Sequence, residues 1–162
     1  MDWDKATDAI LISSFAVLAI FVVLGLIQWI SRRSLKKVDK QLLFMPIPLI
    51  LMVIVYLVCD KVLPQFFPDF MPTRPNGSGE YSFPSTHVMV VTTIFFVVIT
   101  ALPKYIKSKP VRYILEIIMF ALASIVATGR VLSNMHSIVD VIGGVVFAFI
   151  FTGIYSQCLK KI

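Results

Sequence analysis

The chain has 162 residues, of which 58% are hydrophobic and 15% are charged, and its mean hydropathy is +0.89. This apolar content exceeds what one water-soluble domain of such length can bury, so the composition excludes an ordinary soluble protein. We expect a single membrane domain over residues 1–162. The formal net charge of +6 comes mostly from basic residues between apolar runs, which indicates membrane anchoring and no nucleic-acid partner.

Five mostly apolar runs follow one another along the chain, each about long enough to cross a bilayer as a helix. They cover residues 8–30, 42–59, 88–102, 113–129 and 138–155. Backbone polar groups cannot stay unpaired in hydrocarbon, so these runs must be helices. The predicted fold class is therefore all-α, a polytopic membrane helix bundle with about five transmembrane helices. Acidic residues precede the first run, unlike the basic start of a signal peptide, so we expect this helix to be retained.

Basic residues concentrate in two connections and at the C-terminus. They are Arg32, Arg33, Lys36, Lys37 and Lys40, then Lys104, Lys107, Lys109 and Arg112, then Lys160 and Lys161. The positive-inside rule assigns these regions to the cytoplasm. We therefore predict a multi-pass protein of the cell membrane, with the N-terminus outside and the C-terminus cytoplasmic. Residues 60–86 and 130–137 then face outward.

Both histidines of the chain, His87 and His136, lie at outward ends of predicted helices. Asp140 lies four residues after His136. If the last helix already includes His136, the two side chains share one face, and the carboxylate can accept from one imidazole nitrogen. The other nitrogen would remain free as a nucleophile or base. The alternative is a histidine at the start of the helix with a snorkelling aspartate, although an ionisable residue inside an apolar run usually has a partner.

Other polar residues of the outward side each have an ordinary interpretation. Arg130 alone is typical of an interfacial anchor, and Arg74, followed by Pro and Gly, is typical of a turn. Ser85 and Thr86 precede the third apolar run like N-cap residues. Taken together, two guanidinium groups and a helix N-terminus offer donors suited to phosphate oxygens. We expect the two outward connections to meet over one pocket at the membrane surface.

Three blocks of this sequence resemble the signature of the type 2 phosphatidic acid phosphatase superfamily. The blocks are Arg74-Pro75, then Pro84-Ser85-Thr86-His87, then Arg130 with five residues before His136 and three more before Asp140. The signature covers residues 74–140, and the likeness continues to the C-terminus.

The sequence departs from the family pattern at three positions. Phe67 stands where the family has lysine, Thr86 replaces a glycine, and Gly129 replaces a serine. Whether Lys61 substitutes for the missing lysine is open from the sequence. The family's membrane members typically have six spanning helices, whereas this chain has five apolar runs. We therefore expect one helix fewer before the signature.

The resemblance implies a membrane lipid phosphatase that needs no metal or other cofactor. In this scheme His136 attacks phosphorus and forms a phosphohistidine, Asp140 orients the ring, and His87 protonates the leaving oxygen before activating water. The groups that hold the phosphate oxygens would be Arg74, Arg130, Ser85 and the backbone N–H groups near Thr86. Because both histidines, both arginines and the aspartate are retained, we expect an active enzyme, and the short chain favours a bacterial one.

The predicted substrate is a lipid phosphate or diphosphate whose tail stays among the membrane lipids. An aromatic and proline-rich stretch at 64–72 is suited to the interface, although it equally fits loop packing. Polyprenyl diphosphates such as undecaprenyl diphosphate, and phosphatidate or phosphatidylglycerol phosphate, all remain open. Rival interpretations are a transporter, an inactive scaffold or a lipid-phosphate binding protein of the same fold. Gly143, Gly144 and Gly153 permit a homodimer and equally fit packing within one chain.

Overall fold

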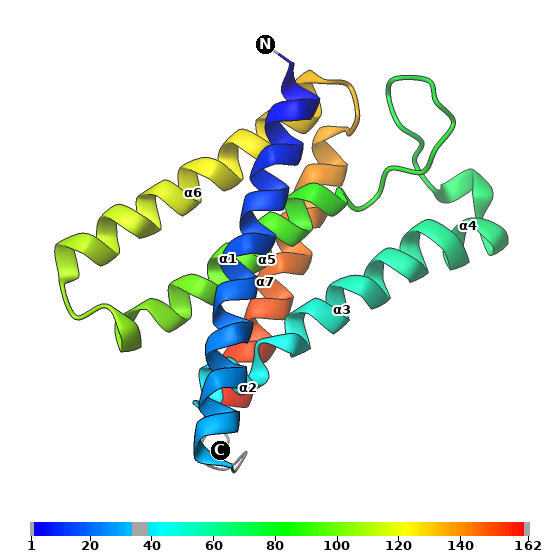
Figure 1. Ribbon diagram of the computed structural model, residues 1–162. Coiled ribbons are helices and arrows are strands. Elements are labelled where there is room, and N and C mark those ends of the chain that lie inside the picture. Colours follow the sequence, from blue (N-terminus) through cyan, green and yellow to red (C-terminus); the bar gives the residue numbers. More distant parts are fainter. Residues whose placement is uncertain (1, 34–38, 161–162) are drawn as a thin grey trace.

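The computed structural model describes residues 2–33 and 39–160. Within this part the chain forms helices and one isolated β-bridge, with no extended strand (Figure 1). The helices are α1 (Trp3–Arg32), α2 (Lys40–Phe44), α3 (Pro46–Leu57), a π-helix η2 (Val58–Val62), α4 (Leu63–Phe66), a 3₁₀ helix η3 (Pro68–Phe70), α5 (Thr86–Tyr105), α6 (Lys109–Leu132) and α7 (Ile138–Lys160). Five helical stretches are long and apolar enough to cross a membrane: α1, the continuous stretch Lys40–Phe66, α5, α6 and α7. The expected all-α membrane bundle of five spans is confirmed.

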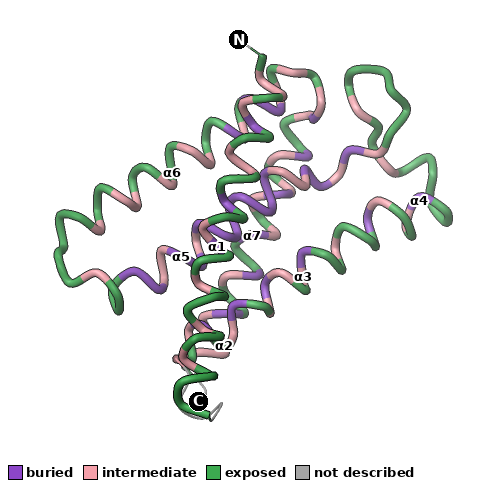
Figure 2. Tube along the Cα trace, viewed as in Figure 1, coloured by how far each residue is buried: buried purple, intermediate pink, exposed green. Residues whose placement is uncertain are grey.

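Helix α5 forms the centre of the bundle. It packs against α1, α6 and α7 and more lightly against α3, and most of its residues are buried (Figure 2). The other spans expose apolar residues along much of their length, as expected of helices that face lipid. Helices α3 and α6 diverge from the centre to opposite sides (Figure 1). The core is thus built around α5, with the outer helices as its partial cover.

The second apolar run differs from the single helix predicted over 42–59. Met45 separates α2 from α3, and α3 begins at Pro46, where the missing N–H of proline costs no helical hydrogen bond. The stretch then passes through the π-helix Val58–Val62 before ending at Phe66. Single π-helical turns often occur at functional sites, because the extra residue re-aims the side chains of one turn.

Helices α5 and α7 are in close backbone contact at Gly144. A Cβ atom added there would lie 2.8 Å from the carbonyl oxygen of Ser85 and 3.1 Å from the backbone nitrogen of Met89. Only glycine allows the two backbones to approach this closely. The start of α5 is therefore held against the second turn of α7.

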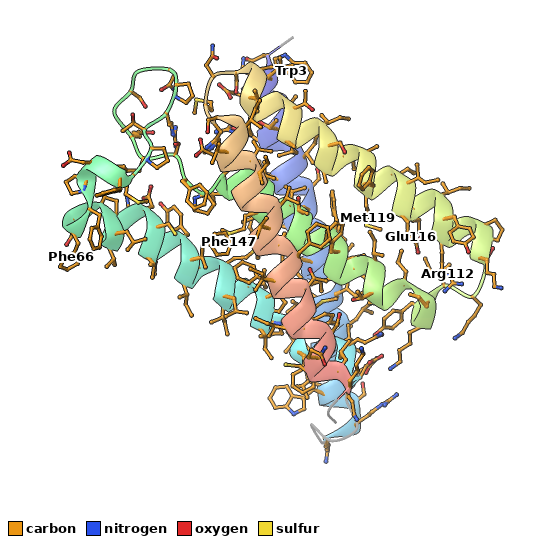
Figure 3. The ribbon with its side chains drawn as sticks, turned by 180° about the vertical axis from the view of Figure 1, so that it is seen from behind. Trp3, Phe66, Arg112, Glu116, Met119 and Phe147 are labelled. Atoms are coloured by element: carbon orange, nitrogen blue, oxygen red, sulfur yellow. The ribbon has the colours of Figure 1, made fainter. Side chains whose placement is uncertain are left out.

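One end of the bundle gathers segments that are distant in sequence. The N-terminus of α1, the start of α5 and the link between α6 and α7 lie together there, whereas the C-terminus lies at the opposite end (Figure 1). Trp3, labelled in Figure 3, packs against Gly129 near the end of α6. The basic residues Lys36, Lys37 and Lys161, which the sequence assigns to the cytoplasmic side, lie outside the described residues.

Candidate active site

Arg74 lies in a tight turn between η3 and α5. Thr73 and Tyr81 form the isolated antiparallel bridge, the Arg74 N–H donates to the Glu80 carbonyl oxygen at 2.8 Å, and Gly77 adopts a positive φ of 76°. The predicted turn is therefore present. The guanidinium also pairs with the Glu80 carboxylate at 2.7 Å and lines a cavity beneath the turn, so Arg74 is more than a turn residue.

The start of α5 contributes three of the predicted side chains. Ser85 is at the N-cap position but makes no side-chain cap bond, and its buried Oγ atom has no hydrogen-bond partner among the described residues. Its backbone N–H donates to the Asp140 carbonyl oxygen at 3.0 Å. Thr86 and His87 follow in the first turn and line the cavity. Because the first N–H groups of a helix lack partners within it, this turn is suited to an anion.

The link between α6 and α7 positions the third block. The backbone N–H of His136 donates to the Arg130 carbonyl oxygen at 3.1 Å, which folds the link back onto the end of α6. Helix α7 begins at Ile138, as the predicted run does, so the helix does not include His136 and a shared helical face does not bring it to Asp140. His136 nevertheless lies near Asp140, with 3.9 Å between Nδ1 and Oδ2, because the link curves back at this point.

Asp140 holds this arrangement through a reciprocal cap with Ser137. The Ser137 N–H donates to Asp140 Oδ2 at 2.7 Å, and the Asp140 N–H donates to Ser137 Oγ at 3.2 Å. This pattern is a capping box, in which two side chains satisfy each other's free backbone donors. Asp140 is fully buried. Its Oδ2 atom both accepts the cap hydrogen bond from Ser137 and lies nearest the His136 ring.

The first turns of α1 contribute groups that the sequence reasoning missed. Asp8 Oδ1 lies 2.7 Å from His87 Nε2, and Asp4 Oδ1 lies 3.3 Å from Arg130 Nη1. Thr7 also accepts from Arg130 at 3.5 Å. The acidic residues at the start of α1 were visible in the sequence. No local signal connects Asp8 with His87, 79 positions later, or Asp4 with Arg130, 126 positions later.

These segments enclose a cavity of about 630 Å³. Its lining includes five predicted site residues, namely Arg74, Thr86, His87, Arg130 and His136. Ser85 and Asp140 do not line the cavity. They hydrogen-bond to each other through their backbones, and Asp140 contacts His136, which does line it. Lys61 lines the cavity and pairs with Asp60 at 2.6 Å, whereas Phe67 is exposed and is not part of the lining. A cation is thus present near the turn although the family's lysine position holds Phe67.

Several buried polar side-chain atoms in and behind the cavity lining lack a hydrogen-bond partner among the described residues. Within the described part of the chain, the side-chain atoms of this kind at the site are Arg74 Nε, Ser85 Oγ, Arg130 Nε, His136 Nδ1 and Asp140 Oδ1. Buried polar atoms nearly always have hydrogen bonds, so their concentration at one place indicates a ligand site. Three of them belong to donors that match the oxygens of an anion.

The electrostatic surroundings keep His136 neutral. Burial lowers the pKa of His136 to about 4, the positive charge of Arg130 adds to this effect, and Asp140 opposes it. A neutral imidazole has a free lone pair on one nitrogen. In the tautomer that has its proton on Nδ1, the nitrogen on the Asp140 side, that lone pair is on Nε2, and His136 is then suited to nucleophilic attack.

Comparison with known proteins places the chain among related sequences. A family model described as the PAP2 superfamily matches residues 40–162. Among solved structures, the fold is similar to a transmembrane PAP2-type phosphatidylglycerolphosphate phosphatase from Bacillus subtilis, with a TM-score of 0.63 and 23% identity over 98% of this chain and 77% of that one. A search of curated proteins found no match. Because the family model covers most of the sequence, the chain belongs to the PAP2 superfamily, as its three signature blocks predict.

Proposed function

We propose that this protein is a membrane lipid phosphatase that hydrolyses a lipid phosphate or diphosphate through a phosphohistidine intermediate. The observation that carries the proposal is a group of buried donor atoms, Arg74 Nε, Ser85 Oγ and Arg130 Nε, that have no partner among the described residues and lie beside two histidines. Guanidinium groups and a helix N-terminus stabilise the charge of a transferring phosphoryl group. Membership of the PAP2 superfamily supports the same activity.

In the proposed first step, Nε2 of His136 attacks the phosphorus atom as the bond from phosphorus to the leaving oxygen breaks. His87 gives its proton to that oxygen, and Asp140 stabilises the charge that His136 acquires. In the second step His87 takes a proton from water, the water oxygen bonds to phosphorus, and inorganic phosphate leaves with His136 restored. Arg74 and Arg130 hold the remaining oxygens throughout. The scheme uses no metal ion.

We place the cavity on the extracytoplasmic side of the cell membrane. Support comes from the opposite end of the bundle, where Lys40, Lys104 and Lys160 lie and where Lys104 pairs with Asp39 at 2.6 Å. Basic residues at that end favour a cytoplasmic location. The leaving group would then be the remainder of the lipid, an alcohol or a lipid phosphate, whose tail stays in the outer leaflet. Phosphatidylglycerol phosphate, phosphatidate and polyprenyl diphosphates are the candidate substrates.

The decisive experiment is phosphate release from a panel of these lipids by the purified full-length protein in detergent. We expect His136→Ala and His87→Ala each to lower kcat at least about 10³-fold. Asp69→Ala, an exposed substitution in η3 away from the cavity, should leave kcat unchanged. Wild-type activity in either histidine variant would refute the assigned roles.

An inactive scaffold of the same fold is the alternative, and the missing family lysine is the observation that favours it. Vanadate, which mimics five-coordinate phosphorus, separates the two. The enzyme should bind vanadate and lose that binding on Arg130→Gln. If no lipid on the panel releases phosphate and vanadate does not bind, the phosphatase proposal fails.

A further inference from the structure

Helix α1 brings two carboxylates to Arg130 and His87, which line the cavity, from outside the segment that matches the family model. Asp4 and Asp8 are one helical turn apart and share a face of α1. Arg130 Nη1 lies 3.3 Å from Asp4 and 4.0 Å from Asp8, and Asp8 also contacts His87. The family match begins at residue 40, so these carboxylates are a feature of this chain beyond the shared signature.

The contact of Asp8 with His87 places a negative charge beside the side chain that must protonate the leaving group. In the proposed function, His87 protonates the leaving oxygen, so that oxygen must approach a ring nitrogen of His87. Asp8 Oδ1 lies 2.7 Å from Nε2 of the same ring. The Asp8 side chain is 56% exposed, which leaves it room to move aside for a substrate while remaining its neighbour.

The other cations of the cavity offer no surplus positive charge. Arg74 is paired with Glu80 at 2.7 Å, and Lys61 is paired with Asp60 at 2.6 Å. The charged groups that act on His87 are Asp8 from α1, Arg130 from α6 and Arg74 from the turn. Arg130 likewise already faces Asp4 and Asp8, so among the described residues of the cavity an additional anion on the leaving group would meet Asp8 with no unpaired cation beside it.

Lipid phosphomonoesters and lipid diphosphates differ in the group that they would place beside His87 and Asp8. Hydrolysis of a phosphomonoester expels an alcohol oxygen bonded to carbon, and from phosphatidate the whole leaving group is uncharged. Hydrolysis of a lipid diphosphate at its terminal phosphorus instead expels an oxygen that belongs to a lipid phosphate anion. Two like charges within a few ångströms repel, and partial burial weakens the screening by water. Resting on the proposed function, we infer that Asp8 makes this site select lipid phosphomonoesters over lipid diphosphates.

A matched substrate pair tests the inference. Phosphatidate and diacylglycerol pyrophosphate carry the same tail and differ only in the second phosphate. We expect the full-length wild-type protein to prefer phosphatidate in kcat/KM by about tenfold, equivalent to about 1.4 kcal/mol. Asp8→Asn should bring the ratio close to one, and Asp8→Glu should preserve it. Asp2→Asn is the control, because it removes the same charge six residues away and asparagine still caps the helix.

Several results would overturn the inference. One is a wild-type protein that prefers the diphosphate, and another is an unchanged ratio in Asp8→Asn. An equal fall in kcat/KM for both substrates in Asp8→Asn would also overturn it, because it would show that Asp8 only positions His87. If Asp8→Asn does not fold, a salt series on the wild type replaces it, because charge repulsion weakens as ionic strength rises. A preference that stays constant across that series also refutes the inference. Release of phosphate from neither substrate would instead refute the proposed function.

Discussion

Replacement of Gly144 by alanine adds a methyl group where α7 lies against the start of α5. The new Cβ would lie 2.8 Å from the Ser85 carbonyl oxygen and 3.1 Å from the Met89 nitrogen, both of which are backbone atoms. Ordinary contacts of a Cβ atom begin near 3.4 Å, so the two helices must separate by about 0.5 Å. This separation would stretch the 3.0 Å hydrogen bond from the Ser85 N–H to the Asp140 carbonyl oxygen.

Both stability and activity should fall in this variant. Overpacking costs about 1–3 kcal/mol, and the higher helix propensity of alanine offsets up to about 1 kcal/mol of it. We therefore expect a net loss of about 1–2 kcal/mol in the free energy of unfolding. The same shift moves Ser85 and His87 relative to His136, and misplacement of this size lowers kcat/KM by about tenfold to a hundredfold.

Gly153→Ala is the matched control, because a Cβ added at Gly153 meets no atom within 4 Å. It makes the same substitution in the same helix, so its melting temperature should be unchanged or slightly raised. The assay combines thermal unfolding in detergent with kcat/KM for lipid phosphate hydrolysis. If Gly144→Ala behaves like Gly153→Ala in both measurements, the close contact of α5 and α7 does not hold the site.

Two further predictions concern His136 and the far end of the bundle. Because the pKa of His136 is lowered to about 4, kcat/KM corrected for substrate ionisation should hold as pH falls through 6.5 and decline only near pH 4; a decline centred at 6.5 would contradict a buried, neutral nucleophile. Tyr155→Phe removes the 2.8 Å hydrogen bond from the buried Tyr155 hydroxyl to the Gln41 carbonyl oxygen. It should cost about 0.5–1.5 kcal/mol in thermal unfolding and leave kcat/KM unchanged; altered kcat/KM would show that this distant contact reaches the site.

Much of the fold could be predicted because the membrane reduces the choice of structure. In hydrocarbon an apolar run of sufficient length must be a helix, so run length alone predicts the five spans. The break at Met45 and the π-helical turn at Val58–Val62 depend on local backbone geometry, which hydropathy does not report. The start of α7 was predictable in principle, since Ser137 and Asp140 form the spacing of a capping box.

The site was partly predictable for a different reason. The signature blocks lie at helix ends that face one side, so the positions of His87, Arg130 and His136 follow from counting spans. The pairing of Asp8 with His87 does not follow, because the two are 79 residues apart and meet only through the packing of α1 beside α5. Side-chain pairs between helices require the helix rotations, which hydropathy leaves free.

The central position of α5 has a consequence for how the protein responds to its membrane. His87 is carried on the span with the most buried residues, whereas Arg130, itself buried, is near the end of α6, a span with few buried residues. A thicker or thinner bilayer changes the tilt of lipid-facing helices first. We expect a change in bilayer thickness to alter phosphate binding by Arg130, and hence KM. Proton transfer by His87, and with it kcat, should stay nearly constant.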